Sequence, residues 1–518
     1  MNETTASALR VLPDYLAQHV VLSMAALALG TLIGLPLAVA AARRPSWRWP
    51  ILTVAGLVQT IPGLALLALF YPMLLGLSAL TTSLFGFGVP ALGFLPSLLA
   101  LTLYAVLPIL RNGLAGLTGI DPGVLEAADG VGMTAWQRLR MVEVPLAAPV
   151  AMAGVRTAAV WTIGAATLST SIGQTSLGNY IFSGLQTENW VFVLFGCTAA
   201  TGLAIVVDQL LGFIDDGAAR RDQRRVLLGL AGLGIGTIAA LAALLGGGPR
   251  PYVVGAKNFS EQFILAELIS KRLEQEGASA DRKQNLGSAV VFRALANSEI
   301  DVYVDYSGTL WTNVMARQDT PSRADMLDEL TADMKTRHGV AVLGSLGFEN
   351  AYVLAMRADR AASLGIHTIT DLALHASRLT LGTDLEFLSR PEWTALQKAY
   401  ALEFAAKRSF SPTFMYRAIG DGSADVITAF SSDGRIAGQS LVVIGDDKQV
   451  SPTYDAVVLV SPKRAADALL RRALSPLVGR ISVERMREAN LAVDRDTNKV
   501  SPREAALTLL SALGLAGR

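Results

Sequence analysis

Residues 126–145 read EAADGVGMTAWQRLRMVEVP and lie between two apolar stretches that are each long enough to cross a bilayer. The segment carries, in order, Glu126, Ala127, Ala128, Gly132, Val142, Val144 and Pro145. We expect a helix to start across Glu126 to Asp129, Gly132 to allow a sharp turn, and Pro145 to end the element. If the spacing of these residues arose by chance, the segment is an ordinary surface hairpin without a functional role. The segment therefore predicts a short helical hairpin between two membrane spans.

Outward from this hairpin, the amino-terminal half is almost continuously apolar and predicts six membrane spans. They cover about residues 18–42, 50–72, 90–110, 147–170, 190–213 and 226–247. Arginines follow the first and third spans and separate the fifth from the sixth, whereas residues 73–90 and 174–190 contain neither arginine nor lysine. Because positive residues are retained on the cytoplasmic side, we expect the hairpin inside the cell and the carboxy-terminal half outside.

The carboxy-terminal half has ordinary soluble composition, and the first lysine of the chain is Lys257. A glycine-rich linker at 246–249 is expected to divide a membrane domain, 1–250, from a soluble domain, 251–518. Short β-rich runs then alternate with helical stretches, which favours an α/β fold with largely parallel sheets. A helix is expected over about 260–275, with Ser260 as its cap.

Aromatic and small polar residues recur where these strands end. Examples are Tyr306, Phe348, Asp384, Phe387, Phe430 and Tyr454. Ligands bind α/β sheets at the carboxyl ends of strands, and aromatic faces attract a quaternary ammonium by about 0.5–2 kcal/mol each. The alternative is that each is an ordinary core aromatic. Donors for a ligand carboxylate would be Asn258, Ser260, Gln262, Asn285, Ser288 and Arg390, although Arg390 could instead pair with Glu386.

Several functional classes find no support in the sequence. The net charge of +1 excludes nothing by itself, no basic patch in the sequence points to nucleic acid, and the single cysteine, Cys197, allows no disulfide. No phosphate-binding loop, nucleophile elbow or CxxC motif occurs, and the four histidines are not clustered as metal ligands. No cleavable signal precedes the first span. We therefore expect neither an enzyme site nor a cofactor nor a metal.

Residues 126–145 resemble the cytoplasmic coupling loop of bacterial ABC importer permeases. That pattern is EAA, three residues, Gly, nine residues, then I-x-L-P, and every spacing fits here. The resemblance implies a type I permease fold in which residues 121–146 dock on a separate ATPase. Its coupling residues would be Glu126, Ala127, Ala128, Gly132 and Pro145. It also implies a homodimer of this chain in the inner membrane, because one six-span half cannot enclose a pathway.

The phrases GAKNFSEQFILAELI, NSEIDVYVDYSGTLWT, LGTDLEFLSRPEW and AFSSDGRI resemble the substrate-binding proteins of glycine betaine/carnitine/choline importers. The resemblance implies a type II, two-lobed fold that closes over its ligand. Lobe one would be about 252–358 plus 452–518, and lobe two about 359–451. Tyr306 and Tyr454 match two tyrosines of the family's cage for a methylated ammonium. Phe430 replaces a third, and Thr309 matches a position that influences specificity.

Together these resemblances predict a fused permease and receptor for quaternary amines such as glycine betaine, choline or carnitine. Ergothioneine, a trimethylammonium amino acid imported by similar fused permeases, fits the altered cage as well. A ligand-gated channel or membrane sensor would also join a two-lobed receptor to spans. A channel has no reason to carry the coupling loop, and a sensor should have a cytoplasmic signalling domain. An outer-face enzyme with an anchor would need only one span and a catalytic constellation.

Overall fold

The computed structural model describes residues 3–86, 88–187, 189–245, 251–317, 319, 321–451, 453–495 and 497–516. The chain forms two compact units, Met1–Phe182 with Val191–Gly247, and Ser183–Trp190 with Gly248–Arg518. The first unit is helical and the second is α/β, as the predicted fold class requires. The expected linker at 246–249 lies outside the described residues.

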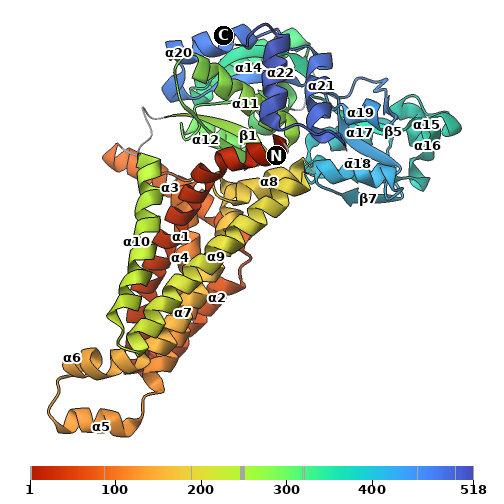
Figure 1. Cartoon of the computed structure of the whole chain (residues 1–518). Helices are drawn as coiled ribbons and strands as arrows, with labels where there is room; N and C mark the ends of the chain where they lie inside the picture. The colour runs from red at the N-terminus through yellow and green to blue at the C-terminus, as the bar shows by residue number, and fades with distance from the viewer. Residues whose placement is uncertain are drawn as a thin grey trace. The chain divides into compact units, whose positions relative to one another are not determined.

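The helical unit is built around α4, which packs against both α1 and α7 (Figure 1). Small residues allow these close contacts, because a Cβ added at Gly30 of α1 would lie 2.6 Å from Ala105 of α4. The helices are α1 (Glu3–Arg43), α2 (Pro45–Thr60), α3 (Gly63–Phe85), α4 (Phe94–Thr118), α5 (Pro122–Gly130), α6 (Ala135–Arg138), η1 (Leu139–Glu143), α7 (Val144–Ala166), η2 (Thr167–Ile172), α8 (Gly178–Gln186), α9 (Trp190–Ala219) and α10 (Gln223–Leu245).

Six segments among the described residues are long and apolar enough to cross a membrane, the number that the sequence predicts. The second differs in place, since it is Gly63–Phe85 and not 50–72. The reason is Pro62, which lacks a backbone N–H and holds Ile61 in an extended conformation with φ −72° and ψ 124°. The apolar stretch is therefore broken into two helices, α2 and α3.

The α/β unit contains two five-stranded sheets with the same strand pattern, β2-β1-β3-β10-β4 and β7-β6-β8-β5-β9. The strands are β1 (Tyr252–Lys257), β2 (Ala280–Leu286), β3 (Val302–Tyr306), β4 (Ala341–Glu349), β5 (Tyr352–Arg357), β6 (Thr380–Thr383), β7 (Ala406–Ser409), β8 (Val426–Phe430), β9 (Leu441–Ile444) and β10 (Asp455–Val460). The first sheet and its helices form lobe one, and the second sheet and its helices form lobe two.

Each sheet is mixed, which corrects the expectation of largely parallel sheets. β10 runs antiparallel to β3 and β4, and β5 runs antiparallel to β8 and β9. These are the two strands that the chain enters from the other lobe. They begin at the edge where the lobes meet, whereas β3 and β8 end there. Because β5 belongs to the second sheet, the first crossing follows Glu349, several residues before the expected boundary at 358.

Helices cover both faces of each sheet (Figure 1). In lobe one the larger core joins β1, β3 and β10 to α11, α20, α21 and α22. In lobe two one core lies under α16 and α17 and another under α18. These helices, with the remaining ones, are α11 (Ser260–Gln275), α12 (Ser288–Ala296), α13 (Ser307–Thr309), η3 (Leu310–Val314), α14 (Arg323–His338), α15 (Ala358–Leu364), α16 (Ile369–His375), η4 (Ala376–Arg378), η5 (Phe387–Ser389), α17 (Pro391–Tyr400), α18 (Pro412–Gly420), α19 (Arg435–Gly438), η6 (Pro462–Arg464), α20 (Ala468–Leu474), η7 (Ser475–Leu477), α21 (Val483–Asp494) and α22 (Pro502–Ala512).

One predicted cap is wrong. The residue that precedes α11 is Phe259, and no side chain caps this helix end. Ser260 is the first helical residue, and its hydroxyl donates to the buried carboxylate of Asp494. Lobe one therefore uses Ser260 to hold α11 against α21.

Candidate functional site

A cavity of about 210 Å³ lies between the two lobes of the α/β unit, at the edge where strands of both sheets end or begin. Five aromatic side chains line it: Phe259, Tyr306, Tyr352, Phe430 and Tyr454. The Phe259 and Phe430 rings are stacked, with centroids 5.7 Å apart and planes 8° apart. Tyr352 lies 5.0 Å from Phe430 and 6.1 Å from Tyr454. The rings thus form one continuous aromatic wall.

Strand ends explain how residues so far apart in the sequence meet here. Tyr306 and Phe430 are the last residues of β3 and β8. Tyr352 is the first residue of β5, and Tyr454 directly precedes β10. Since all four positions lie at the edge between the lobes, the sheet topology alone brings their rings together.

The hydroxyl of each tyrosine in this wall donates to a carboxylate. Tyr306 donates to Glu261 over 2.6 Å, and Tyr352 donates to Asp384 over 2.7 Å. Tyr454 donates to Glu392. Burial, reinforced by these carboxylates, raises the pKa of all three phenols. The tyrosines therefore stay protonated, and all three line the cavity.

Two cations flank the aromatic wall, and each already has an acidic partner. Arg390 pairs with Glu392 at 2.9 Å, and its guanidinium lies 5.0 Å from the centre of the Tyr352 ring. Burial alone would lower the pKa of Arg390, but the neighbouring acidic groups raise it above its usual value, so the charge is fixed. Lys257 pairs with Asp305 and lies over the Tyr306 ring.

Arg390 pairs more closely with Glu392 than with Glu386, the partner expected from the sequence. Glu386 is 3.7 Å away, farther than Glu392, which is two residues along the chain from Arg390. Burial would raise the pKa of Glu392, and the Arg390 guanidinium more than offsets that effect and lowers it. Arg390 also lines the cavity, so the ion pair does not remove it from the reach of a ligand.

The cavity brings together eight of the twelve ligand residues that the sequence predicts: Asn258, Ser288, Tyr306, Thr309, Asp384, Arg390, Phe430 and Tyr454. The other four do not line it. Phe348 and Phe387 are core residues of the two lobes. Gln262 lies behind the wall and donates to the Tyr306 hydroxyl over 3.0 Å. Asn285 is buried elsewhere, with a positive φ of 63°.

Sequence reasoning missed Phe259, Tyr352, Lys257 and Asn350, which also line the cavity. Phe259 follows β1 within the quoted phrase GAKNF, so its position after a strand was a usable signal. Tyr352 opens a strand that was expected to belong to lobe one, and this wrong boundary hid its place at the crossing.

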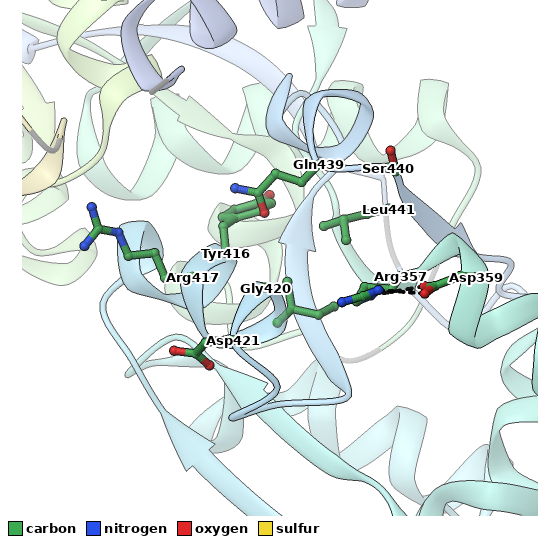
Figure 2. A pocket seen from close by; sticks show the side chains of 10 residues that line it. Arg357, Asp359, Tyr416, Arg417, Gly420, Asp421, Gln439, Ser440 and Leu441 are labelled. Carbon is green, nitrogen blue, oxygen red and sulfur yellow. Dashed lines mark hydrogen bonds and ion pairs between the residues drawn. The ribbon is translucent and has the colours of Figure 1, made fainter. Parts of the chain in front are cut away.

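A larger cavity of about 550 Å³ lies on lobe two alone, between α18 and the segment before β9 (Figure 2). Its walls carry charges of both signs, and Arg357 is paired with Asp359 at 2.6 Å. No aromatic face other than that of Tyr416 lines it among the described residues. The smaller cavity between the lobes is therefore the better candidate for a ligand site.

The predicted hairpin forms beyond the ends of α4 and α7 (Figure 1). Gly132 adopts φ +78°, which confirms the expected turn. Two details differ. The first helix, α5, begins at Pro122 and is capped by Asp121, so Glu126 is its middle residue and does not start it. Pro145 does not end an element but lies in the first turn of α7, directly after the π-helical stretch 139–143.

Ion pairs fasten the hairpin to the helical unit. Glu143 is 6% exposed and accepts from Arg43, the last residue of α1, over 2.8 Å. It also accepts from Arg138 over 2.9 Å, and Arg138 in turn pairs with Asp129 on α5. Glu143 ends a short π-helical stretch, a local distortion that is frequent at functional sites.

The exposed surface of the hairpin is unusually apolar. Val131, Trp136 and Met141 are 75%, 67% and 65% exposed. Glu126, Ala127 and Gly132 are not buried, whereas Ala128 is. A hairpin that is rigidly fastened and presents apolar side chains has the form of a docking element.

The fold and the site define a class: a multi-span membrane transport protein fused to a two-lobed solute receptor. The family model for the substrate binding domain of ABC-type glycine betaine transport system matches residues 250–512. The model for the binding-protein-dependent transport system inner membrane component matches residues 30–220. The chain belongs to the first family, carries the domain of the second, and is a component of an ABC importer, a multi-pass protein of the inner membrane.

Similar proteins cover the whole chain or its membrane half. The ergothioneine transport permease/ergothioneine binding protein EgtU of Helicobacter pylori (strain G27) is 29% identical over 90% of this chain and 84% of its own length. The glycine betaine/carnitine/choline transport system permease protein OpuCB of Bacillus subtilis (strain 168) is 39% identical over 38% of this chain and 82% of its own length. A crystal structure of a glycine betaine/carnitine/choline ABC transporter is 25% identical, covers 51% of this chain and 99% of that chain, and has a TM-score of 0.45.

Proposed function

We propose that this chain is both the pore and the receptor of an importer for quaternary ammonium compounds, of the glycine betaine, choline and carnitine type. The supporting observation is the cavity walled by five aromatic rings. A trimethylammonium group has no N–H to donate, so hydrogen-bond acceptors cannot hold it, whereas ring faces attract it by about 0.5–2 kcal/mol each. The proposal includes a domain boundary near residue 250 and lobe boundaries near the two crossings between the lobes. It also includes the ligand-binding roles of the eight predicted residues that line the cavity.

The hairpin at 121–146 is proposed to dock on a separate cytoplasmic ATPase. Its exposed Val131, Trp136 and Met141 would be covered by that subunit, and Glu126, Ala127, Ala128, Gly132 and Pro145 would shape the contact. Two copies of this chain would enclose the pathway between them. The one-sided distribution of arginines supports an external α/β unit and a cytoplasmic hairpin.

Ergothioneine is a second candidate ligand within the same architecture. The relative whose name states ergothioneine matches both halves of this chain, whereas OpuCB matches the membrane half. Phe430 also supplies a ring face without the hydroxyl of a tyrosine, so the wall makes one polar contact fewer at this position. Both observations favour a ligand set wider than the simple betaines.

Calorimetric titration of the full-length chain in detergent with glycine betaine, choline, carnitine and ergothioneine tests the proposal. We expect saturable binding of at least one of them. Tyr306→Ala and Tyr454→Ala should each weaken it at least tenfold, about 1.4 kcal/mol. Tyr306→Leu and Tyr454→Leu, which keep most of the volume, separate loss of the ring face from misfolding. Wild-type binding in all four variants would refute the aromatic site.

A further inference from the structure

Three buried carboxylates contact the tyrosines of the aromatic wall; Asp384 also lines the cavity, whereas Glu261 and Glu392 do not. Glu261 lies in the first turn of α11, Asp384 follows β6, and Glu392 lies in the first turn of α17. They come from both lobes, yet each accepts a hydrogen bond from a different tyrosine of the wall. Their exposed fractions are 3%, 5% and 4%. Each of the three tyrosine rings that line the cavity is thus backed by a buried carboxylate.

Such groups are costly to bury unless their charge is compensated. Glu392 has Arg390, and Asp305 has Lys257. Among the described residues, Asp384 accepts only from neutral donors, including the backbone N–H groups of Glu386 and Phe387 at 2.8 and 2.7 Å. No ion pair joins Glu261 to any residue that the structure describes. Two buried carboxylates therefore lie beside the cavity without a cationic partner in the described parts of the chain.

Glu261 is surrounded by donors from four segments. Besides Tyr306, it accepts from Asn350 over 2.9 Å, from Asn490 over 2.8 Å and from Ser432. Burial raises the pKa of Glu261, and these four hydrogen bonds oppose that effect. With four donors around it, the carboxylate is held as an acceptor. Ser432 belongs to lobe two, so the same carboxylate also ties the lobes together.

A hydrogen bond to a carboxylate polarises the donor in a low-dielectric interior. When a phenol donates to such a group, electron density shifts toward its ring, and the negative ring face attracts a cation more strongly. Glu261 and Glu392 do not line the cavity, whereas Asp384 lines it with both oxygens already accepting hydrogen bonds from Tyr352 and from the backbone. Glu261 and Glu392 therefore strengthen attraction for a cation without offering it an acceptor, which suits a methylated ammonium and disfavours a primary one that must replace its hydrogen bonds to water.

We propose that Glu261, Asp384 and Glu392 are positioning residues that act through the tyrosine hydroxyls, fix the ring faces, and set selectivity for a permanently charged quaternary ammonium over a neutral group of the same shape. This inference rests on the proposed function, because it requires that the cavity takes such a cation. It assigns selectivity to the carboxylates that accept from the tyrosine hydroxyls, and for Asp384 this role comes in addition to its place in the cavity lining.

The test compares two ligands of equal shape. Choline and 3,3-dimethyl-1-butanol differ in the charged nitrogen, and glycine betaine and 3,3-dimethylbutanoate form a second such pair. Each is titrated into the full-length chain and its variants Glu261→Gln, Asp384→Asn and Glu392→Gln. We expect each variant to lower the ratio of cation affinity to isostere affinity by threefold or more, with little change for the isostere.

A matched control exists in lobe one. Tyr252 donates to Asp467 over 2.8 Å, the same arrangement, but neither residue lines the cavity. Asp467→Asn should leave the affinity ratio unchanged. If the carboxylates were only structural, each variant would weaken binding of the cation and of its isostere equally. The inference is overturned if the ratio of cation affinity to isostere affinity is unchanged in all three carboxylate variants. It is also overturned if this ratio falls as much in Asp467→Asn as in those variants.

A double variant tests the route through the hydroxyl. In Tyr306→Phe the donor is gone, so adding Glu261→Gln should lower the ratio by less than it does in the wild type. Fully additive effects contradict action through the hydroxyl. If the wild type binds the cations but the variants keep the ratio, only this inference fails. If it binds neither the cations of the two pairs nor carnitine nor ergothioneine, the proposed function fails with it.

Discussion

Glu143→Gln is the perturbation that best tests whether the hairpin is fastened by its ion pairs. The carboxylate of Glu143 is 6% exposed and receives one hydrogen bond from Arg43 and one from Arg138. A charge-assisted hydrogen bond contributes about 1.5–3 kcal/mol, and breaking a buried pair costs about 3–5 kcal/mol. The arginines are partly exposed, so solvent screening reduces the loss, and we expect about 2 kcal/mol.

That loss shifts the equilibrium between fastened and detached hairpin about 30-fold. Hydrogen exchange of the full-length chain measures it directly, since the amides of α6, η1 and the start of α7 should exchange roughly 10- to 100-fold faster. Uptake in cells should fall at least tenfold while ligand binding stays at the wild-type level. Arg43→Gln should show most of the same effect.

The matched control is Asp216→Asn. Asp216 belongs to an exposed pair with Arg225 at 3.7 Å, and such pairs contribute about 0–1 kcal/mol. Its exchange rates and uptake should match the wild type. Unchanged exchange across 135–145 in Glu143→Gln would refute the fastening role, whatever the uptake.

Three further outcomes are expected. Gly132→Val forces a β-branched residue to φ +78°, which costs about 1–3 kcal/mol although open space surrounds the site. Uptake should therefore fall in Gly132→Val and fall less in Gly132→Asn, because asparagine tolerates this conformation better. Equal uptake in the two variants would contradict this. Burial raises the pKa of Asp494 to about 6, so the folded state binds a proton more tightly than the unfolded state, and the free energy of unfolding falls as pH rises from about 4 to about 6. In denaturant unfolding, Asp494→Asn should therefore become more stable relative to wild type by about 1–3 kcal/mol between pH 4 and pH 7. A stability difference between variant and wild type that stays constant over this pH range would argue against it. Tyr306→Leu should weaken binding of a quaternary amine about 10-fold while Tyr252→Leu, in the same sheet, leaves it unchanged; similar losses in both would show that sheet stability and not the cavity wall is responsible.

The sequence predicts the hairpin well because its local signals are strong. Gly132 takes the turn that the spacing requires, and the apolar stretches around it form spans. The second span was misplaced because hydropathy continues across Ile61 and Pro62, whereas the backbone cannot. A local rule, the missing N–H of Pro62, overrides an average over about 20 residues.

The sequence predicts most of the residues that line the cavity, but it does not predict the carboxylates that accept from the tyrosine hydroxyls. Tyr306 and Phe430 end apolar strands and Tyr454 precedes one, so a search of strand ends finds them. Glu261 and Glu392 lie in helical first turns, where an acidic residue is ordinary, and nothing in the local sequence shows that tyrosines from other segments donate to them. Pairings across such sequence distances follow from topology alone.

Two strands lack the apolar pattern by which a sequence predicts a strand. β2 and β7 carry runs of polar residues, such as Arg282 to Asn285 and Lys407 to Ser409, and both lie at sheet edges. Edge strands bury fewer side chains and need no apolar pattern. The crossing before β5 was misplaced because the chain passes between the lobes with only two residues between β4 and β5.

Reconstitution in liposomes tests most directly whether the chain transports the solute only when an ATPase subunit drives it through the hairpin at 121–146. The full-length chain is placed in liposomes, and entry of labelled glycine betaine and ergothioneine is followed with and without its co-purified ATPase subunit and ATP. We expect entry against a gradient only when subunit and ATP are both present, and entry at least tenfold slower in Glu143→Gln liposomes. Free passage down the gradient through the chain alone would contradict the account.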